Sequence, residues 1–215
     1  MSRIEVVSSV LAANEAKAEQ NKARLHAAGA VAVNVLSAPG SGKTTLLQHT
    51  LTALTDLPAA VLVGDLQTSR DAERLAATGA PVVQINTGQG CHLTPDQVAE
   101  GLDRLDLEQI KLVFIENIGN MVCPAGVDLG EDYRVALLSV PEGDDKIAKY
   151  PTLFQAADLI LLSKVDLLPV LPFNVAQVEA DLALVNTRAP LLRRSTLTGE
   201  GMPEWLAWLR SRRRS

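Results

Sequence analysis

The segment Ser37-Ala38-Pro39-Gly40-Ser41-Gly42-Lys43-Thr44-Thr45 decides the fold of this 215-residue chain. It lies between an apolar, β-branched run, Val31–Leu36, and a helical run, Leu46–His49. A glycine-rich loop that ends in Gly-Lys-Thr between a strand and a helix is typical of a phosphate-binding loop, or P-loop. The segment therefore predicts a nucleotide site in which backbone N–H groups at a helix N-terminus face phosphate.

The residues of this P-loop (37–45) have separate tasks. Gly40 and Gly42 allow the backbone to curl around an anion. Lys43 can reach the β- and γ-phosphates and is a candidate catalytic residue, while Thr44 can ligate Mg²⁺. Ser37 stands where the usual pattern has its first glycine. The residues expected to contact nucleotide here are Gly40, Ser41, Gly42, Lys43, Thr44 and Thr45.

Seven short apolar runs alternate with amphipathic stretches along the chain. The expected strands are Val31–Leu36, Ala60–Val63, Val82–Ile85, Leu112–Ile115, Val135–Val140, Leu159–Leu162 and Pro190–Arg193. Near-continuous apolar strands that alternate with helices indicate a mostly parallel central sheet flanked by helices, which is the α/β class. Ligands of such sheets bind at the carboxyl ends of the strands. With the P-loop, this pattern predicts a P-loop NTPase.

The two ends of the chain give simpler expectations. Residues 1–30 are expected to form an N-terminal helical arm, because Ser9 can cap a run rich in Ala, Glu, Lys and Gln that ends at Gly29. Near the C-terminus, Trp205 and Trp208 recur at helical spacing among leucines, which favours packing in the core over a ligand platform.

Two late segments indicate which base the site reads. Ser163-Lys164-Val165-Asp166 resembles the guanine-reading motif Asn-Lys-x-Asp, with Ser163 in place of the asparagine. Asp166 can accept hydrogen bonds from the ring N–H and the exocyclic amine of guanine, a donor pair that adenine lacks. Lys164 would lie along the base. The loop Ser195-Thr196-Leu197 can offer backbone N–H groups to the base oxygen. These segments predict a GTPase domain over residues 31–215.

Acidic residues follow two of the predicted strands. Asp65 comes after the run Ala60–Val63 and Gly64, and Glu116 directly follows Leu112–Ile115. Both carboxylates should lie at the same sheet edge as Lys43, where they can hold Mg²⁺ directly or through water. We therefore expect Asp65 and Glu116 to act in catalysis and, with Thr44, in Mg²⁺ binding. Asp71 is a further candidate for orienting water, although a surface acid in a helix fits it equally well.

The only two cysteines, Cys91 and Cys123, lie in loops among the strand ends, and His92 follows the first. Gly88-Gln89-Gly90 can supply a bent backbone on which Cys91 and His92 converge. Two thiolates and an imidazole suit Zn²⁺ or Ni²⁺, and three ligands leave the coordination shell incomplete. A water molecule or a second subunit could complete it.

Four segments carry a family resemblance: Gly64–Thr68 (GDLQT), Asn86–Leu93 (NTGQGCHL), Glu116–Pro124 (ENIGNMVCP) and Ser139–Lys146 (SVPEGDDK). From about Val31 onward, the chain resembles the HypB family of hydrogenase nickel-incorporation GTPases. The resemblance implies a GTPase of the signal-recognition, partitioning and metallochaperone (SIMIBI) class, which assists nickel delivery to the large subunit of [NiFe]-hydrogenase.

The same resemblance implies how the metal residues are used. The family's nucleotide-sensing metal site matches Cys91, His92 and Cys123, near a GTP-dependent homodimer interface. The family also works with a small zinc-binding maturation partner, HypA. The alternatives are a urease accessory-type nickel GTPase, which usually has a Cys-Pro-His motif, and a nucleotide-gated scaffold with negligible hydrolysis.

The composition of the chain limits where in the cell it is expected and what it is expected to bind. A formal charge of −5 and a pI near 5.2 give no general attraction to nucleic acid or to anionic membranes. No stretch approaches the roughly 18 apolar residues that a membrane span requires. We therefore expect a cytoplasmic protein that binds neither nucleic acid nor membrane.

Overall fold

The computed structural model describes residues 3–65 and 69–214, and its centre is a seven-stranded sheet in which every pairing is parallel. The strands are β1 (Val31–Ser37), β2 (Ala59–Asp65), β3 (Val82–Asn86), β4 (Leu112–Glu116), β5 (Tyr133–Ser139), β6 (Leu159–Ser163) and β7 (Leu191–Arg194). All seven predicted strands are present, and most begin or end one or two residues from the predicted bounds. The fold-class prediction is confirmed. Residues 66–68 of the predicted Gly64–Thr68 segment lie outside the described residues.

Strand β1 lies at the point in the sheet where the order of the strands changes direction. The order is β3-β2-β4-β1-β5-β6-β7, so the chain builds β2, β3 and β4 on one side of β1 and β5, β6 and β7 on the other. Such a switch point leaves a crevice at the carboxyl ends of the strands, where α/β sheets bind their ligands. The P-loop follows β1 directly and therefore lies at this crevice.

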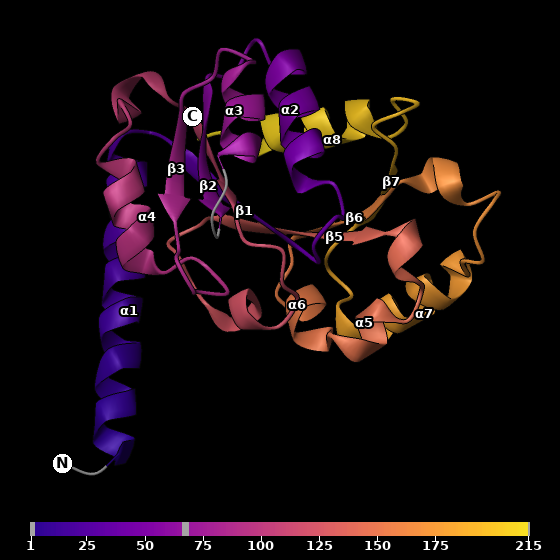
Figure 1. The fold of residues 1–215 in the computed structure, drawn as a ribbon, viewed down its shortest axis with the longest axis horizontal. Helices are drawn as coiled ribbons and strands as arrows, with labels where there is room; N and C mark the ends of the chain where they lie inside the picture. The colour runs from indigo at the N-terminus through magenta and orange to yellow at the C-terminus, as the bar shows by residue number, and fades with distance from the viewer. Residues whose placement is uncertain (1–2, 66–68, 215) are drawn as a thin grey trace.

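Helices cover both faces of the sheet (Figure 1). They are α1 (Arg3–Ala27), α2 (Lys43–Ala53), α3 (Arg70–Ala76), α4 (Pro95–Leu102), α5 (Lys146–Lys149), α6 (Pro151–Gln155), α7 (Val175–Val185) and α8 (Met202–Ser211). Short 3₁₀ turns are η1 (Leu107–Gln109), η2 (Cys123–Gly126), η3 (Val140–Glu142) and η4 (Val165–Leu167). Helices α2, α3 and α8 pack on one face, and α1, α4, α6 and α7 pack on the other.

The core under α2 and α8 contains the two tryptophans. Trp205 and Trp208 are both buried and stack with ring centroids 5.6 Å apart. Trp205 also packs on Phe114 of β4 and donates through Nε1 to Thr50 Oγ1 at 2.8 Å. A buried indole N–H needs such a partner, so α8 is fixed on α2 by a polar contact as well as by apolar burial. The predicted core role of the tryptophans is confirmed.

Helix α1 begins earlier than predicted and joins the body by its C-terminal half. The cap predicted at Ser9 is wrong, because the helix already runs from Arg3, with no glycine or proline to stop it. Leu25 is fully buried, and Asn21 Nδ2 donates to Pro95 O at 2.8 Å and to Leu129 O at 3.1 Å. The first turns extend away from the body (Figure 1). The division at residue 30 stays a prediction.

None of the helices in the described part of the chain is long and apolar enough to cross a membrane.

Replacing one fully buried leucine tests the packing of the P-loop helix. We expect Leu47→Ala in α2 to lower the free energy of unfolding by about 2–5 kcal/mol, because Leu47 has no exposed surface and its loss leaves a cavity. Urea unfolding measures the change. Leu184→Ala, at a side chain 87% exposed on α7, is the matched control and should leave stability nearly unchanged. Equal losses in both variants would contradict the described packing.

Candidate nucleotide and metal sites

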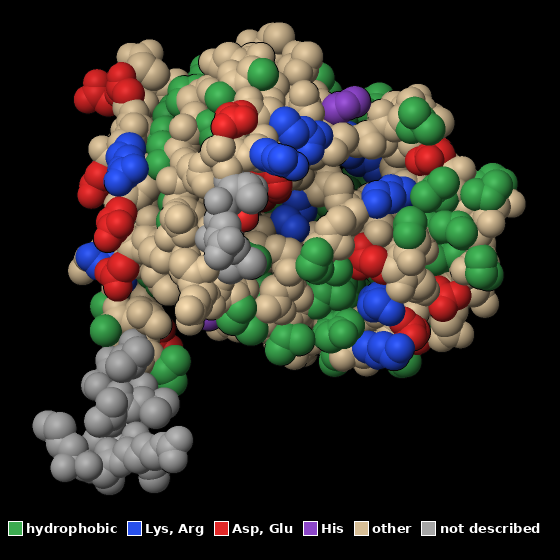
Figure 2. Space-filling model, viewed as in Figure 1, with side chains coloured by type: hydrophobic (Ala, Val, Ile, Leu, Met, Phe, Trp, Pro, Cys, Tyr) green, Lys and Arg blue, Asp and Glu red, His purple; other side chains and the backbone are tan. Residues whose placement is uncertain are grey.

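A cavity of about 460 Å³ opens at the carboxyl edge of the sheet, beside the P-loop. This volume lies within the range of small-molecule sites. Its lining residues are Pro39, Gly40, Gly42, Lys43, Thr44, Thr45, Gly64, Asp65, Asp71, Arg74, Glu116, Asn117, Ile118 and Gly119. Figure 2 shows the hollow, with basic and acidic side chains around it. The cavity brings the predicted phosphate and Mg²⁺ residues together, except Ser41. Ser41 has no exposed surface, and its hydroxyl is hydrogen-bonded within the protein to Ala38 O and Glu142 Oε1.

The P-loop is shaped by two glycines and one buried lysine. Gly40 and Gly42 have φ values of 76° and 100°, a left-handed backbone that other residues rarely adopt, and α2 begins directly afterwards at Lys43. Lys43 is 8% exposed, and its Nζ donates to Ser37 Oγ at 2.9 Å. Burial lowers the pKa of Lys43, while nearby Glu116 opposes that effect. Ser37, which replaces the usual first glycine, is thus the partner of the lysine.

Glu116 has one satisfied and one unsatisfied oxygen. Thr44 Oγ1 donates to Glu116 Oε1 at 2.6 Å, whereas Oε2 is buried without a hydrogen-bond partner. Burial raises the pKa of Glu116 to about 7, against the opposing effects of the Thr44 hydrogen bond and of Lys43. An orphaned carboxylate oxygen beside a threonine hydroxyl is a hard-oxygen set of the kind that Mg²⁺ prefers, so these residues fit that ion. Asp65 lines the same cavity at the end of the neighbouring strand.

The predicted base-reading segments lie beside the P-loop but outside the cavity lining. Ser163 Oγ donates to Ser41 O at 2.8 Å, and Lys164 Nζ donates to Gly40 O at 2.7 Å. Ser163 therefore ties the end of β6 to the P-loop by its hydroxyl. Lys164 has a φ of 60°, and it alone among the described non-glycine residues has a positive φ.

The second predicted base loop is joined to the first. Ser195 Oγ donates to Asp166 Oδ1 at 2.5 Å, and the backbone N–H groups of Leu197 and Thr198 donate to Ser195 Oγ at 3.1 and 3.2 Å. The loop that contains Thr196 is thereby fixed next to the carboxylate of Asp166. The structure brings together all the residues predicted to read the base, and their contact with a base stays a prediction.

The three predicted metal ligands converge. One ligand atom from each of Cys91, His92 and Cys123 lies within 4.8 Å of the others. Cys91 is exposed and Cys123 is half-buried, both as free thiols. A hydrogen bond with Cys123 raises the pKa of the Cys91 thiol, so a metal ion bound there must displace a proton. The cluster has the soft donors that Zn²⁺ and Ni²⁺ accept, on two loops next to the nucleotide cavity.

Several cavity residues were not predicted. Asn117 and Gly119 follow Glu116, and the rule that flagged Glu116 at a strand end could have included Asn117. Arg74 of α3 donates to Thr45 Oγ1 and Gln48 Oε1 at 3.1 Å each, a contact between helices that the sequence does not reveal. Glu142, which lies outside the cavity lining and was not predicted either, accepts from Ser41 Oγ at 2.6 Å and so fixes the P-loop from η3.

A parallel sheet with its P-loop at the switch point, and a cavity lined by that loop and two strand-end carboxylates, defines a P-loop nucleotide-binding protein. Comparisons with known proteins agree with this class. Residues 31–193 match the family model described as the CobW/HypB/UreG nucleotide-binding domain. The chain belongs to this family, as a member of its HypB branch.

Individual relatives give the extent of the similarity. The chain is 50% identical over 211 residues to the hydrogenase maturation factor HypB of Escherichia coli (strain K12), covering 98% of this chain and 73% of that protein. The crystal structure of HypB from Helicobacter pylori in complex with nickel superposes with a TM-score of 0.89 at 40% identity, over 94% of this chain and 97% of that one. The signal recognition particle 54 kDa protein from Aeropyrum pernix K1, in complex with GDP, shares the fold alone. Its TM-score is 0.55 at 13% identity, over 77% of this chain and 41% of that one.

The raised pKa of Glu116 predicts a pH-dependent stability. With a pKa of about 7 in the folded state and an ordinary value of 4.5, Glu116 keeps its proton on folding but loses it on unfolding between these values. Stability should therefore fall as pH rises from about 4.5 through 7, by roughly 3 kcal/mol at most. Glu116→Gln removes this dependence.

Urea unfolding of both proteins at pH 5 and pH 8, without nucleotide and with chelator, measures the effect. The Gln variant should gain stability relative to the parent at pH 8 only. An equal pH response in the two proteins would contradict the described burial.

Proposed function

We propose that this chain is a GTP-hydrolysing metallochaperone that assists nickel insertion into [NiFe]-hydrogenase. The observation that carries the proposal is the convergence of Cys91, His92 and Cys123 within 4.8 Å, on loops that leave the strand ends of the nucleotide cavity. The similarity to hydrogenase maturation factors supports the hydrogenase as the final recipient. The nickel complex of a HypB relative supports nickel as the cargo.

GTP would bind with its phosphates in the cavity and its base beyond it. The backbone N–H groups of the P-loop and the Lys43 ammonium would hold the phosphates. Thr44, Asp65 and Glu116 would hold Mg²⁺, directly or through water, and the ion would neutralise charge that develops on the phosphates when it is bound. Asp71 lines the cavity and would orient the attacking water. The products are GDP and phosphate.

The base would lie against Lys164 and Asp166, with the Ser195–Leu197 loop at its edge. Asp166 Oδ1 accepts from Ser195 Oγ, so the carboxylate is held in one orientation before any base arrives. A fixed carboxylate selects guanine because adenine would leave it unpaired. The hydrogen bonds from Ser163 and Lys164 to P-loop carbonyls would hold the base-binding and phosphate-binding parts of the site in a fixed relative position.

Nickel would bind to the cysteine and histidine ligands as cargo, and Zn²⁺ would suit the same donors. Three ligands leave at least one position open, which a water molecule or a second subunit would fill. We infer a GTP-dependent homodimer whose interface would lie near the metal ligands, supported by the apolar side chain of Val122, which is 65% exposed next to Cys123.

The remaining partners follow from the proposed task. A small zinc-binding protein like HypA would exchange metal with this site, and the hydrogenase large subunit would receive it. The work would take place in the cytoplasm, without nucleic acid or membrane.

Replacing the carboxylate of Asp166 with an amide tests whether the site recognises guanine. Asp166→Asn should weaken binding of GTP and improve binding of xanthosine triphosphate, because the new amide can donate to the oxygen that replaces the guanine amine. Competition between the two nucleotides, measured by calorimetry, gives the ratio of affinities for parent and variant. Equal affinity of the parent for ATP and GTP would be evidence against the assignment.

A metal titration in two nucleotide states tests the function as a whole. Nickel affinity should differ between the GDP form and the form with a non-hydrolysable GTP analogue, typically about 5–150-fold in coupled systems. Linkage requires nickel to change nucleotide affinity by the same factor. Cys123→Ala should remove this coupling and leave GTP binding largely intact. Identical nickel affinities in the GDP and GTP-analogue forms, measured at the same oligomeric state, would contradict the proposal.

A further inference from the structure

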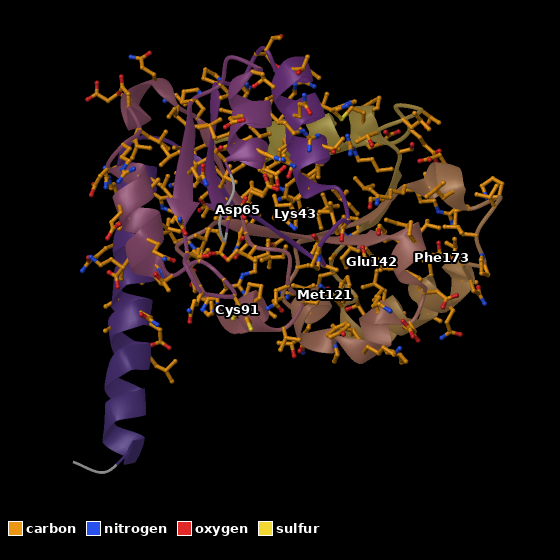
Figure 3. All side chains as sticks on the ribbon, in the orientation of Figure 1. Lys43, Asp65, Cys91, Met121, Glu142 and Phe173 are labelled. Carbon is orange, nitrogen blue, oxygen red and sulfur yellow. The ribbon has the colours of Figure 1, made fainter. Side chains whose placement is uncertain are left out.

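Only two basic side chains in the described part of the chain line the nucleotide cavity, Lys43 of the P-loop and Arg74 of α3. Lys43 is buried, bonded to Ser37, and would hold the phosphates under the proposed function. Figure 3 shows Lys43 and Asp65 next to each other at the edge of the sheet, and α3 lies beside α2 above them in that view. Arg74 is therefore a cation at the phosphate site whose task has still to be explained.

Arg74 is held against the first turns of α2. Its Nη2 donates to Thr45 Oγ1 and to Gln48 Oε1 at 3.1 Å each. Its Nη1 lies 3.5 Å from Oδ1 of Asp71, one turn earlier on α3. Thr45 directly follows Thr44, the predicted Mg²⁺ ligand. The guanidinium is thus beside the end of α2 that carries the P-loop.

The present partners of Arg74 are ones that a phosphate can replace. Thr45 and Gln48 are neutral acceptors, and the separation from Asp71 is long for a hydrogen bond. A guanidinium can give phosphate two parallel charge-assisted hydrogen bonds, each roughly twice as strong as a bond between neutral groups. The Arg74 side chain is 45% exposed, so much of its surface is free of packing. The side chain can therefore turn from α2 toward an anion in the cavity.

The charges around the cavity favour such a turn when a triphosphate is bound. The lining contains the carboxylates of Asp65, Asp71 and Glu116, and a nucleoside triphosphate adds several negative charges. Burial is the main cause of the raised pKa of Glu116, and the charge of Arg74 is among the influences that oppose it. The guanidinium is therefore within electrostatic reach of the predicted Mg²⁺ ligands, where a γ-phosphate would also lie.

We propose, on the basis of the proposed GTPase function, that Arg74 is a catalytic residue that leaves α2 and binds the γ-phosphate of GTP. In hydrolysis, the water oxygen forms a bond to the γ-phosphorus while the bond from that phosphorus to the β–γ bridging oxygen breaks. The electron pair of the broken bond stays on the β-phosphate of GDP, and both hydrogens of the water leave with inorganic phosphate. Arg74 donates to the γ-phosphate and bridging oxygens, on which negative charge grows during this step.

Arg74→Ala tests this role, with Arg210→Ala as its matched control. Arg210 is 43% exposed and joins α8 to Asp56 by two hydrogen bonds of 2.8 Å, but it lies outside the described cavity lining. Hydrolysis is measured in a single turnover of GTP at one protein concentration, so that the oligomeric state is matched. Calorimetry gives the affinities for GDP and for a non-hydrolysable GTP analogue.

In Arg74→Ala, the rate of hydrolysis should fall on the order of 10²-fold, because a donor to the developing charge is lost. GDP affinity should stay parental, since GDP has no γ-phosphate. Arg210→Ala should hydrolyse GTP at the parental rate. A parental rate in Arg74→Ala with the GTP analogue still bound, or an equal loss in Arg210→Ala, overturns the inference and leaves the proposed function standing. Absence of hydrolysis in the parent is instead a failure of the proposed GTPase function.

Aluminium fluoride separates catalysis from a structural role of Arg74. With GDP it imitates the phosphoryl group in transfer, so it should bind to the parent and not to Arg74→Ala, although GDP binds to both. A side chain that only joined α3 to α2 would change thermal stability and leave the binding of aluminium fluoride unaltered. Equal binding of aluminium fluoride by the two proteins overturns the inference.

A second variant keeps the inference open to refutation where thermal unfolding shows that Arg74→Ala does not fold. Arg74→Lys keeps the charge and the long aliphatic stem but loses the forked pair of donors. It should therefore hydrolyse GTP more slowly than the parent and bind aluminium fluoride with GDP more weakly. Parental values of both quantities in Arg74→Lys overturn the inference.

Discussion

The burial of Lys43 is the constraint on which the rest of the nucleotide site depends. An ammonium group that is 8% exposed is costly unless anionic or hydrogen-bonding groups surround it. The chain supplies Ser37 Oγ as a direct acceptor, and Glu116 is close enough to favour the charged form. Glu116 is itself buried and holds its proton more strongly than usual. The site is thus a set of charges that an anionic ligand and a hard cation would both stabilise.

The oxygen donors and the sulfur and nitrogen donors come from different parts of the fold. Carboxylate and hydroxyl oxygens come from strand ends and the first turn of α2, so a hard cation would meet ligands on regular secondary structure there. The thiols and the imidazole come from loops that follow strand ends, and one ligand atom from each lies within 4.8 Å of the others. Soft ions prefer thiolate and imidazole donors and hard ions prefer oxygen donors, so under the proposed function each ion would keep to its own set of ligands.

The sequence predicted the strands well, and it predicted which residues lie together at the carboxyl edge of the sheet, because both depend on local pattern. The roles of those residues stay predictions. Continuous apolar runs, without the alternation of apolar and polar residues, identified the buried parallel strands. Residues directly after those strands then had to lie at the same carboxyl edge of the sheet. The prediction of a cap at Ser9 was wrong because residues 3–8 are already helical. A capping residue marks the start of a helix only where the residues before it cannot continue the helix. The contacts of Arg74 with Thr45 and of Glu142 with Ser41 could not be predicted, since they join segments that meet only after folding.

The exposure of Cys91 has a kinetic consequence. Under the proposed function, a three-donor cluster at the surface would allow an incoming thiolate or imidazole to add to the bound ion before any original donor leaves. Transfer would then proceed by associative ligand exchange, with an intermediate shared by the donor and acceptor proteins. The rate of such a transfer grows with the acceptor concentration, whereas the rate of spontaneous release does not. In such a transfer the ion would never be free in solution, so it would not bind adventitiously to other proteins.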